Sequence, residues 1–146
     1  MEEVMTCIVV ATDGSGGASR AVEVATGLAK AFACGLLIVT VANHLSGEEV
    51  RQLSRTGVST GDVLEALTDQ TLRAAEARAR QLGLERVETM TCWGDVTQSL
   101  LNIAASNPTR MIVVGRRGRG QLANLQLGSV SQKLVSLAPF PVVVVP

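Results

Sequence analysis

The sequence predicts an α/β protein built on an open, parallel β-sheet with helices on both faces, and two patterns carry this prediction. Short apolar runs rich in β-branched residues alternate along the chain with segments whose apolar residues recur every three or four positions. The run Leu36–Ala42 is also apolar at nearly every position, which is typical of a strand buried on both faces, as in parallel sheets.

The first part of the chain predicts a strand, a helix and a second strand. Thr6–Ala11 is a β-branched run, and the helical spacing that follows it extends from Ala18 to Phe32. Gly35 is the expected end of this helix because glycine commonly terminates helices. Leu36–Ala42 then forms the second strand.

The rest of the chain continues the alternation. Residues 43–62 are polar and predict a long excursion with one helical turn near residues 48–53. Arg86–Trp93 alternates in side-chain character and predicts a strand that places Trp93 in the core or against a helix. Asp95 is placed to cap the helix that follows it. The other expected elements are a helix at 63–82, a helix at 96–106, a strand at 111–114, a helix at 130–137 and a strand at 142–145.

Composition predicts one globular domain, residues 1–146. A chain of about 150 residues buries about 68–70% of its unfolded surface on folding, so it needs no disulfide or metal to be stable. Aromatic residues make up 2% of the chain and the formal net charge is zero, so we expect no nucleic-acid partner. The longest apolar runs fall far short of the roughly 20 residues of a membrane helix, so we expect no membrane partner.

The cysteines and the N-terminus point to the cytoplasm. Cys7, Cys34 and Cys92 fit no zinc-binding spacing, and we expect reduced thiols that fill the core as small apolar residues. The acidic start Met1–Glu3 lacks the basic region of a signal peptide. Both observations predict a cytoplasmic location.

The segment Gly115–Ser131 carries the clearest functional signal. It contains Gly115 and Gly118, then nine residues, then Gly128 and Ser129, between an expected strand and an expected helix. Glycines leave backbone N–H groups uncovered, and a helix N-terminus is a ready site for a phosphate group. The P-loop pattern G-x-x-x-x-G-K-[ST] and the dinucleotide pattern G-x-G-x-x-G are both absent.

This pattern, Gly-x2-Gly-x9-Gly-Ser, resembles the ATP-binding signature of the universal stress protein family. Three further segments match that family in order: Asp13–Ser15 after the first strand, Ile112–Gly118 at the fourth strand, and Ala138–Val145 at the last. The resemblance extends from Ile8 to Val145. It implies a five-stranded parallel sheet in the order 3-2-1-4-5, the adenine nucleotide alpha hydrolase-like fold.

The resemblance also implies a nucleotide site where the strand order reverses, between the first and fourth strands. ATP is the implied ligand, with AMP and ADP as alternatives and Mg²⁺ as a companion ion that protein side chains alone would not bind. Asp13 would contact the adenosine part, and backbone near Thr40 and Val41 would contact adenine. The full set of expected binding residues is Ala11, Thr12, Asp13, Thr40, Val41, Val114, Gly115, Arg116, Gly118, Gly128, Ser129, Val130 and Ser131.

Alternatives stay open for several of these residues and for the function. Asp13 could serve only as the cap of the first helix, and Arg116, Arg117 and Arg119 could belong to a solvated loop. The leading functional prediction is a nucleotide-responsive regulatory or stress-response module with no catalytic residue. The alternatives are a slow ATPase, or a dimeric accessory protein that binds no nucleotide. The resemblance further implies a homodimer that pairs through Val142–Val145.

Overall fold

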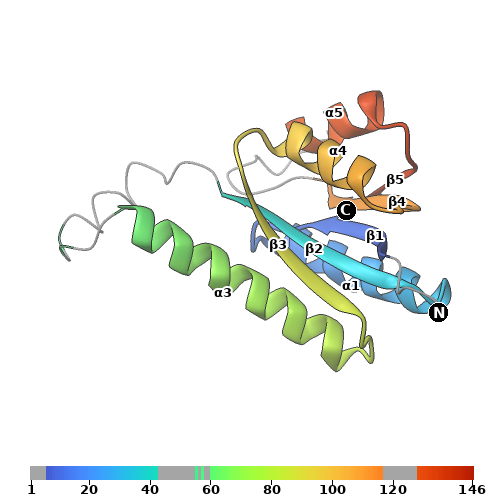
Figure 1. Cartoon of the computed structure of the whole chain (residues 1–146), viewed down its shortest axis with the longest axis horizontal. Coiled ribbons are helices and arrows are strands. Elements are labelled where there is room, and N and C mark those ends of the chain that lie inside the picture. Colours follow the sequence, from blue (N-terminus) through green and yellow to red (C-terminus); the bar gives the residue numbers. More distant parts are fainter. Residues whose placement is uncertain (1–5, 43–54, 56, 58–59, 117–127) are drawn as a thin grey trace.

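The computed structural model describes residues 6–42, 55, 57, 60–116 and 128–146 of the chain (Figure 1). The helical turn expected near residues 48–53 lies outside these described residues, as does Gly118. Among the described helices, none combines the length and the apolar character needed to cross a membrane.

The centre of the molecule is a five-stranded sheet whose neighbouring strands all run parallel, in the order β3-β2-β1-β4-β5. This order and the parallel pairing confirm the predicted fold class. The strands are β1 (Thr6–Ala11), β2 (Gly35–Ala42), β3 (Val87–Trp93), β4 (Met111–Gly115) and β5 (Val142–Val145).

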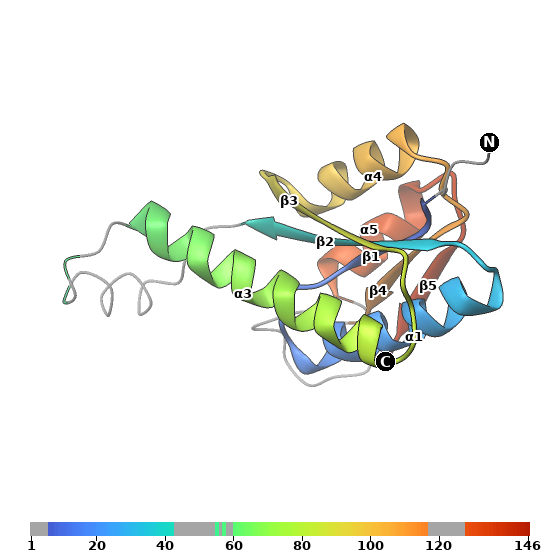
Figure 2. The same ribbon diagram turned by 60° about the horizontal axis from the view of Figure 1, so that its bottom comes forward.

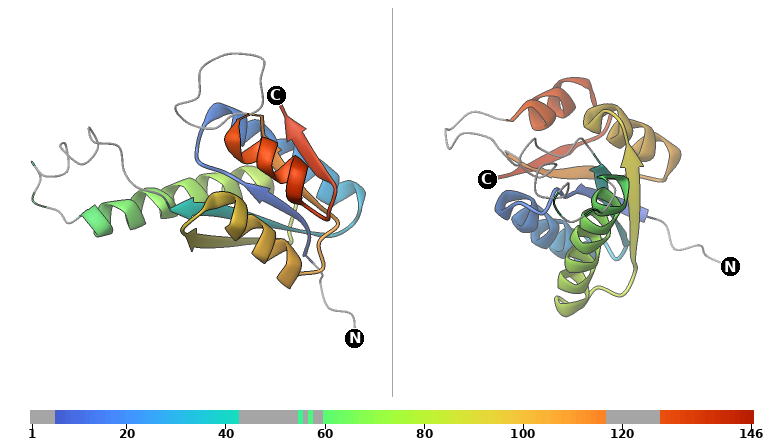
Figure 3. Two further views of the ribbon diagram at one scale, coloured as in Figure 1. Left: turned by 90° about the horizontal axis from the view of Figure 1, so that it is seen from above. Right: turned by 90° about the vertical axis from the view of Figure 1, so that its left-hand side faces the viewer.

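Helices cover both faces of the sheet, in two pairs. The right-hand view of Figure 3 shows the sheet between them, with α1 and α3 on one face and α4 and α5 on the other. The helices are α1 (Gly16–Ala31), α3 (Thr60–Gln81), α4 (Val96–Ser106) and α5 (Ser129–Leu137). α3 begins three residues before its predicted start, and the other predicted helices match within two residues at either end.

The residues that end α1 are not the one that the sequence predicts. Phe32 is the C-cap, and Ala33 then takes the left-handed conformation at φ 54°, which is uncommon for a residue with a Cβ. The N–H of Cys34 donates to the carbonyl of Ala29, which closes the last turn. The helix therefore ends at Ala31, four residues before Gly35, which is already part of β2.

The core consists of two apolar layers, because successive strand residues point to opposite faces of the sheet. Ile8 and Val10 of β1 pack with α1 and α3, whereas Val9 packs with α4 and α5. Side chains of the central strands are almost completely buried on both faces. This accounts for the continuous apolar run in β2 that the sequence displays.

The third strand departs from the prediction because it lies at the edge of the sheet, with β2 as its neighbour. In β3 only Val87 is buried, and the side chain of Trp93 is 63% exposed. The expectation that Trp93 belongs to the core or lies under a helix is therefore wrong. Alternation predicts a strand correctly here, but it does not reveal how much of that strand the helices cover.

The cysteines also differ from expectation. Cys34 is disulfide-bonded, so the prediction that all three cysteines are reduced thiols is wrong for this residue. Cys92 on β3 is a free thiol, and partial burial raises the pKa of this thiol, which lowers its reactivity at neutral pH. The side chain of Cys7 lies outside the described part of the structure.

Candidate functional site

The candidate site lies at the carboxyl ends of β1 and β4. These strands are neighbours, with Val10 opposite Val113, yet the helices that follow them cross to opposite faces of the sheet. The strand order reverses at this point, and in open α/β sheets the ligand crevice forms there.

The turn after β1 forms one wall of this crevice. The backbone N–H of Ser15 donates to Oδ1 of Asp13 at 2.9 Å, and the N–H of Gly14 donates to Oγ1 of Thr12 at 3.2 Å. Gly14 has φ 82°, a conformation that side chains rarely tolerate. Ser15 is the N-cap of α1 and its hydroxyl accepts from the N–H of Ala18. The alternative that Asp13 caps α1 is therefore wrong, because Asp13 closes the turn that precedes the cap.

The end of β2 extends this wall. The N–H of Thr12 donates to the carbonyl of Val39 at 2.9 Å, so the turn after β1 is tied to β2 one residue before Thr40. Thr40 is buried, and Val41 and Ala11 are half-buried. By alternation with Ile38, Thr40 points toward the face that α1 and α3 cover, whereas Val41 packs with the α4 and α5 layer.

The end of β4 and the start of α5 form the opposite wall. The carbonyl of Arg116 accepts from the N–H of Gly128 at 2.7 Å and from the hydroxyl of Ser131 at 2.9 Å, while the N–H of Arg116 donates to the carbonyl of Val145. These bonds hold residues 116 and 128 together. The Ser131 hydroxyl also lies 3.1 Å from the Gly128 carbonyl, so its proton is engaged within this wall.

Gly128 is the N-cap of α5, and no side chain caps the helix there. Its φ of −70° is open to any residue, so this position does not depend on the conformational freedom of glycine. The first N–H groups of a helix have no partner within the helix. Exposed Ser129 and half-buried Val130 therefore present a helix N-terminus at this wall.

Gly115 brings the two walls into contact. A Cβ at this position would lie 3.0 Å from the carbonyl carbon of Gly17 and 3.1 Å from its oxygen. The first turn of α1 therefore packs directly on the end of β4. Val114, the preceding residue, is 3% exposed and belongs to the α4 and α5 layer.

Arg116, the residue that follows β4, carries a buried donor atom without a partner in the described structure. Its Nε is buried and has no hydrogen-bond partner among the described residues. Unpaired buried donors are rare in folded proteins, and a guanidinium binds phosphate and carboxylate groups readily. Of the predicted site residues, only Gly118 lies outside the described structure, and the others gather on the two walls.

Comparisons with known proteins place the chain in a family. The model of the universal stress protein family matches residues 5–146. The chain belongs to the universal stress protein family. A universal stress protein of Thermus aquaticus is 34% identical over 145 residues, covering 94% of this chain and 96% of the relative.

Solved structures of universal stress proteins share the fold. One, a universal stress protein in complex with cAMP, has a TM-score of 0.74 and 26% identity, and the match covers 99% of each chain. Another, from Archaeoglobus fulgidus in complex with dAMP, has a TM-score of 0.72 and 22% identity, covering 99% of this chain and all of the other. At that identity the second likeness shows the fold alone.

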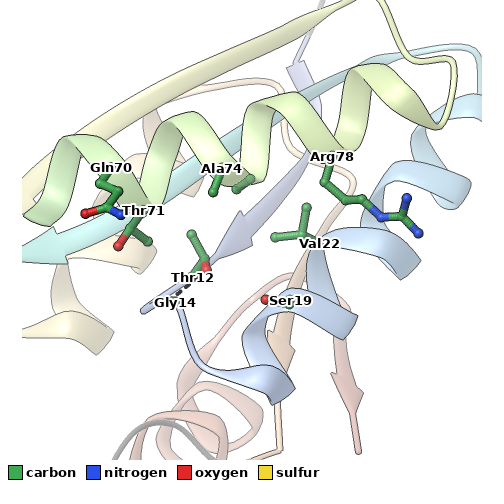
Figure 4. A pocket seen from close by; sticks show the side chains of 9 residues that line it. Thr12, Gly14, Ser19, Val22, Gln70, Thr71, Ala74 and Arg78 are labelled. Carbon is green, nitrogen blue, oxygen red and sulfur yellow. Dashed lines mark hydrogen bonds between the residues drawn. The ribbon is translucent and has the colours of Figure 1, made fainter.

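In this universal stress protein a further cavity of about 250 Å³ opens beside the turn after β1, in the groove between α1 and α3. Figure 2 shows the two helices side by side on their face of the sheet. In Figure 4 the side chains of Thr71 and Ala74 point from α3 toward Thr12 and Val22. The groove is lined by Thr12, Gly14, Ser19, Val22, Gln70, Thr71, Ala74, Ala75 and Arg78.

Sequence reasoning missed the lining that α3 contributes to this groove. Thr71 falls on the helix face that packs on the sheet. It fits the spacing of the apolar residues there, so the sequence marks it as a core position and not as a ligand-binding one. The one available signal is that threonine interrupts the inward stripe of α3, at buried Thr68 and half-buried Thr71. No group of three or more His, Cys, Asp or Glu side chains gathers in the described part of the chain.

Proposed function

We infer that this universal stress protein is an adenine-nucleotide-binding module, and that ATP is its principal ligand, with ADP and AMP as alternatives. The observation that carries this proposal is the buried Nε of Arg116, which has no hydrogen-bond partner among the described residues, in a residue whose carbonyl accepts from Gly128 at the uncapped start of α5. Both features favour an anionic group, and both lie at the point where strand order reverses. The complex of a 26% identical universal stress protein with cAMP supports an adenine nucleotide as the source of that anion.

The proposed contacts follow the two walls. Ala11, Thr12, Asp13, Thr40 and Val41 hold the adenosine part. Phosphate and ribose contact the other wall, and a Mg²⁺ ion at this site would take ligands from phosphate oxygens as well as from the protein. The residues proposed for that wall are Val114, Gly115, Arg116, Gly118, Gly128, Ser129, Val130 and Ser131.

The biological role proposed here is a nucleotide-responsive regulator or stress-response module in the cytoplasm, formed by one domain that spans residues 1–146. Binding would bias the conformation of the crevice walls, because a ligand stabilises the state that it contacts. A homodimer that pairs through β5 belongs to the same proposal.

Thermal unfolding with ATP tests the proposed binding. A ligand at 100 times its dissociation constant stabilises the native state by about 2.7 kcal/mol, and each kcal/mol raises the melting temperature of a chain of this size by roughly 2–4 °C. We therefore expect saturating ATP to raise the melting temperature by about 5–11 °C. Mass spectrometry of small molecules released on denaturation would identify a nucleotide that copurifies.

Two arginines that flank β4 provide a matched pair of variants. Arg116→Gln removes the unpaired guanidinium at the carboxyl end of the strand and should abolish most of the ATP shift. Arg110→Gln changes the arginine at the other end, which lies over the ring of Phe32, and should leave the shift intact. A wild-type protein that responds to none of ATP, ADP and AMP and releases no nucleotide would contradict the proposal.

A further inference from the structure

Cys34 forms a disulfide at the turn between α1 and β2. Its side chain is half-buried and packs against the core layer that α1 and α3 cover. The chain contains three cysteines, and Cys92 is a free thiol. Within the chain this leaves Cys7, the second residue of β1, as the partner of Cys34.

The backbone pairing of the first two strands agrees with this elimination. β1 and β2 are neighbours, and Thr6 lies opposite Gly35, the residue that follows Cys34. The register of this ladder shifts between Thr6 and Ile8, at the position of Cys7. Neighbouring strands lie about 4.7–4.9 Å apart, and disulfides join Cα atoms that are about 4.4–6.8 Å apart. The two cysteines therefore occupy the same end of adjacent strands, as a cross-link requires.

Hydrogen bonds hold Cys34 in place independently of the cross-link. Its N–H donates to the carbonyl of Ala29 at 2.9 Å, and the N–H of Ala33 donates to the carbonyl of Lys30 at 3.1 Å. Ala33 keeps its left-handed φ of 54° within this closed turn. Reduction of the disulfide breaks none of these bonds, so the position of Cys34 beside the start of β1 is kept and the thiols can be oxidised again.

The surroundings of Cys34 favour a reversible disulfide over a permanent one. Ala31, Phe32 and Ala33, which precede it, are all exposed, so a small thiol can approach this turn. Exposed disulfides are often the labile and regulatory ones. In the cytoplasm, the location proposed above, disulfides are usually catalytic or redox-sensing. The chain lacks the C-x-x-C pattern of disulfide oxidoreductases, which favours sensing.

We propose that Cys7 and Cys34 are a redox-sensing modification site, at which a reversible disulfide forms under oxidising conditions. The oxidant is a low-molecular-weight disulfide such as glutathione disulfide. The thiolate of one cysteine attacks it and releases one glutathione, and the second cysteine then displaces the other glutathione from the mixed disulfide. Two electrons and the two thiol protons pass to the two glutathione molecules. A reducing dithiol reverses the exchange and is itself converted to a disulfide.

Oxidation at this site stabilises the fold. The cross-link closes a loop of about 28 residues, from Cys7 to Cys34, that contains α1 and the turn before it. Closing such a loop restricts the unfolded chain more than the folded one. For a chain of this size, the chain-entropy estimate predicts that reduction lowers the melting temperature by about 7–14 °C.

Alkylation in denaturant followed by mass spectrometry tests the pairing on the wild-type chain. The oxidised protein should take up label only at Cys92, and the protein reduced with dithiothreitol at all three cysteines. Buffers of reduced and oxidised glutathione in graded ratios should give intermediate degrees of oxidation. A disulfide that persists in reduced glutathione alone, thiols that persist in glutathione disulfide alone, or a linked peptide that joins Cys34 to a cysteine other than Cys7 would each overturn the proposal.

Serine variants measure the effect on stability. Cys7→Ser and Cys34→Ser should each have the same melting temperature with and without dithiothreitol. Cys92→Ser is the matched control, because Cys92 lies opposite Val41 near the other end of β2, and it should keep the full wild-type shift. Each variant is compared with itself in two redox states, so the packing cost of the substitution cancels. Equal melting temperatures for oxidised and reduced wild type would contradict the stabilising role.

The redox site and the proposed function can fail separately. The nucleotide crevice lies at the carboxyl ends of β1 and β4, whereas Cys34 lies at the amino end of β2. None of these redox measurements requires a nucleotide. A protein that shows the redox shift without an ATP response would retain this proposal and lose the proposed function, and the reverse result would do the opposite.

Discussion

Gly115 ends β4 at the point where the backbone of α1 lies against the sheet. Its hydrogen occupies a space where a Cβ would approach the carbonyl group of Gly17 to 3.0 Å from the carbon and 3.1 Å from the oxygen. Backbone atoms cannot rotate away as a flexible side chain can. The residue therefore controls the distance between the two walls of the candidate site as well as the stability of the fold.

We predict that Gly115→Ala destabilises the protein by about 1–3 kcal/mol, the usual cost of overpacking. The melting temperature should fall by several degrees, since each kcal/mol corresponds to roughly 2–4 °C at this size. Gly27→Ala is the control, because a Cβ there meets nothing within 4 Å and the residue lies inside α1. That variant should stabilise the protein by about 0.4–1 kcal/mol. Equal melting temperatures for Gly115→Ala and the wild type would show that α1 can move aside.

Single residues of the site were predicted with uneven success, for a physical reason. Glycines after an expected strand point to the segment Gly115–Ser131 in the sequence, because positions with special backbone requirements favour glycine. The sequence could not show whether Asp13 or Ser15 caps α1, since aspartate and serine both cap helices and both close turns. Only the observed bonds assign the turn to Asp13 and the cap to Ser15.

At the scale of elements, β5 exposes one side of its backbone. Pro141 and Val145 direct their carbonyl groups to Ile112 and Arg116 beside β4. The N–H and C=O groups of a strand alternate in direction along the chain, so Val143 also faces β4, whereas Val142 and Val144 face outward. An edge with outward N–H and C=O groups can pair with a second strand, which is the basis of the proposed dimer.

Val144→Pro tests that dimer with the smallest disturbance of the fold. Proline lacks the N–H that would face the partner, and edge strands tolerate proline where the N–H points outward. We expect a folded monomer in sedimentation experiments. Val143→Pro is the contrasting variant, because its lost N–H faces β4, and it should lower the melting temperature instead. A folded Val144→Pro protein that sediments as a dimer would refute pairing through this edge.

At the scale of the whole molecule, the fold was more predictable than the surface. Alternating strands and helices with a continuously apolar β2 require a parallel sheet covered on both faces, and family resemblance added the strand order. Coverage at the edges depends on where helices end in space, which no local pattern encodes. Trp93 was misplaced for this reason, and the groove that Gln70 and Thr71 line arises only when α3 packs beside α1.

The groups that the chain brings to the candidate site also bear on whether it could hydrolyse ATP. Rapid phosphoryl transfer requires groups positioned around the γ-phosphate, such as a P-loop lysine and a residue that orients the attacking water. The sequence lacks the P-loop pattern. In the described structure the Ser131 hydroxyl is engaged with backbone carbonyls, and the Arg116 Nε is suited to hold an anion in place. These features favour the proposed nucleotide binding over rapid hydrolysis.

We therefore predict that hydrolysis of saturating ATP with Mg²⁺ proceeds far below about 1 s⁻¹, the low end of typical enzyme turnover. Release of inorganic phosphate from the purified protein measures the rate. Arg116→Gln distinguishes a genuine slow activity from a contaminating ATPase, since the variant should lose any activity that depends on this site. A wild-type rate near 1 s⁻¹ that Arg116→Gln abolishes would show that the crevice is catalytic, and the binding-module proposal would then be replaced by that of an ATPase.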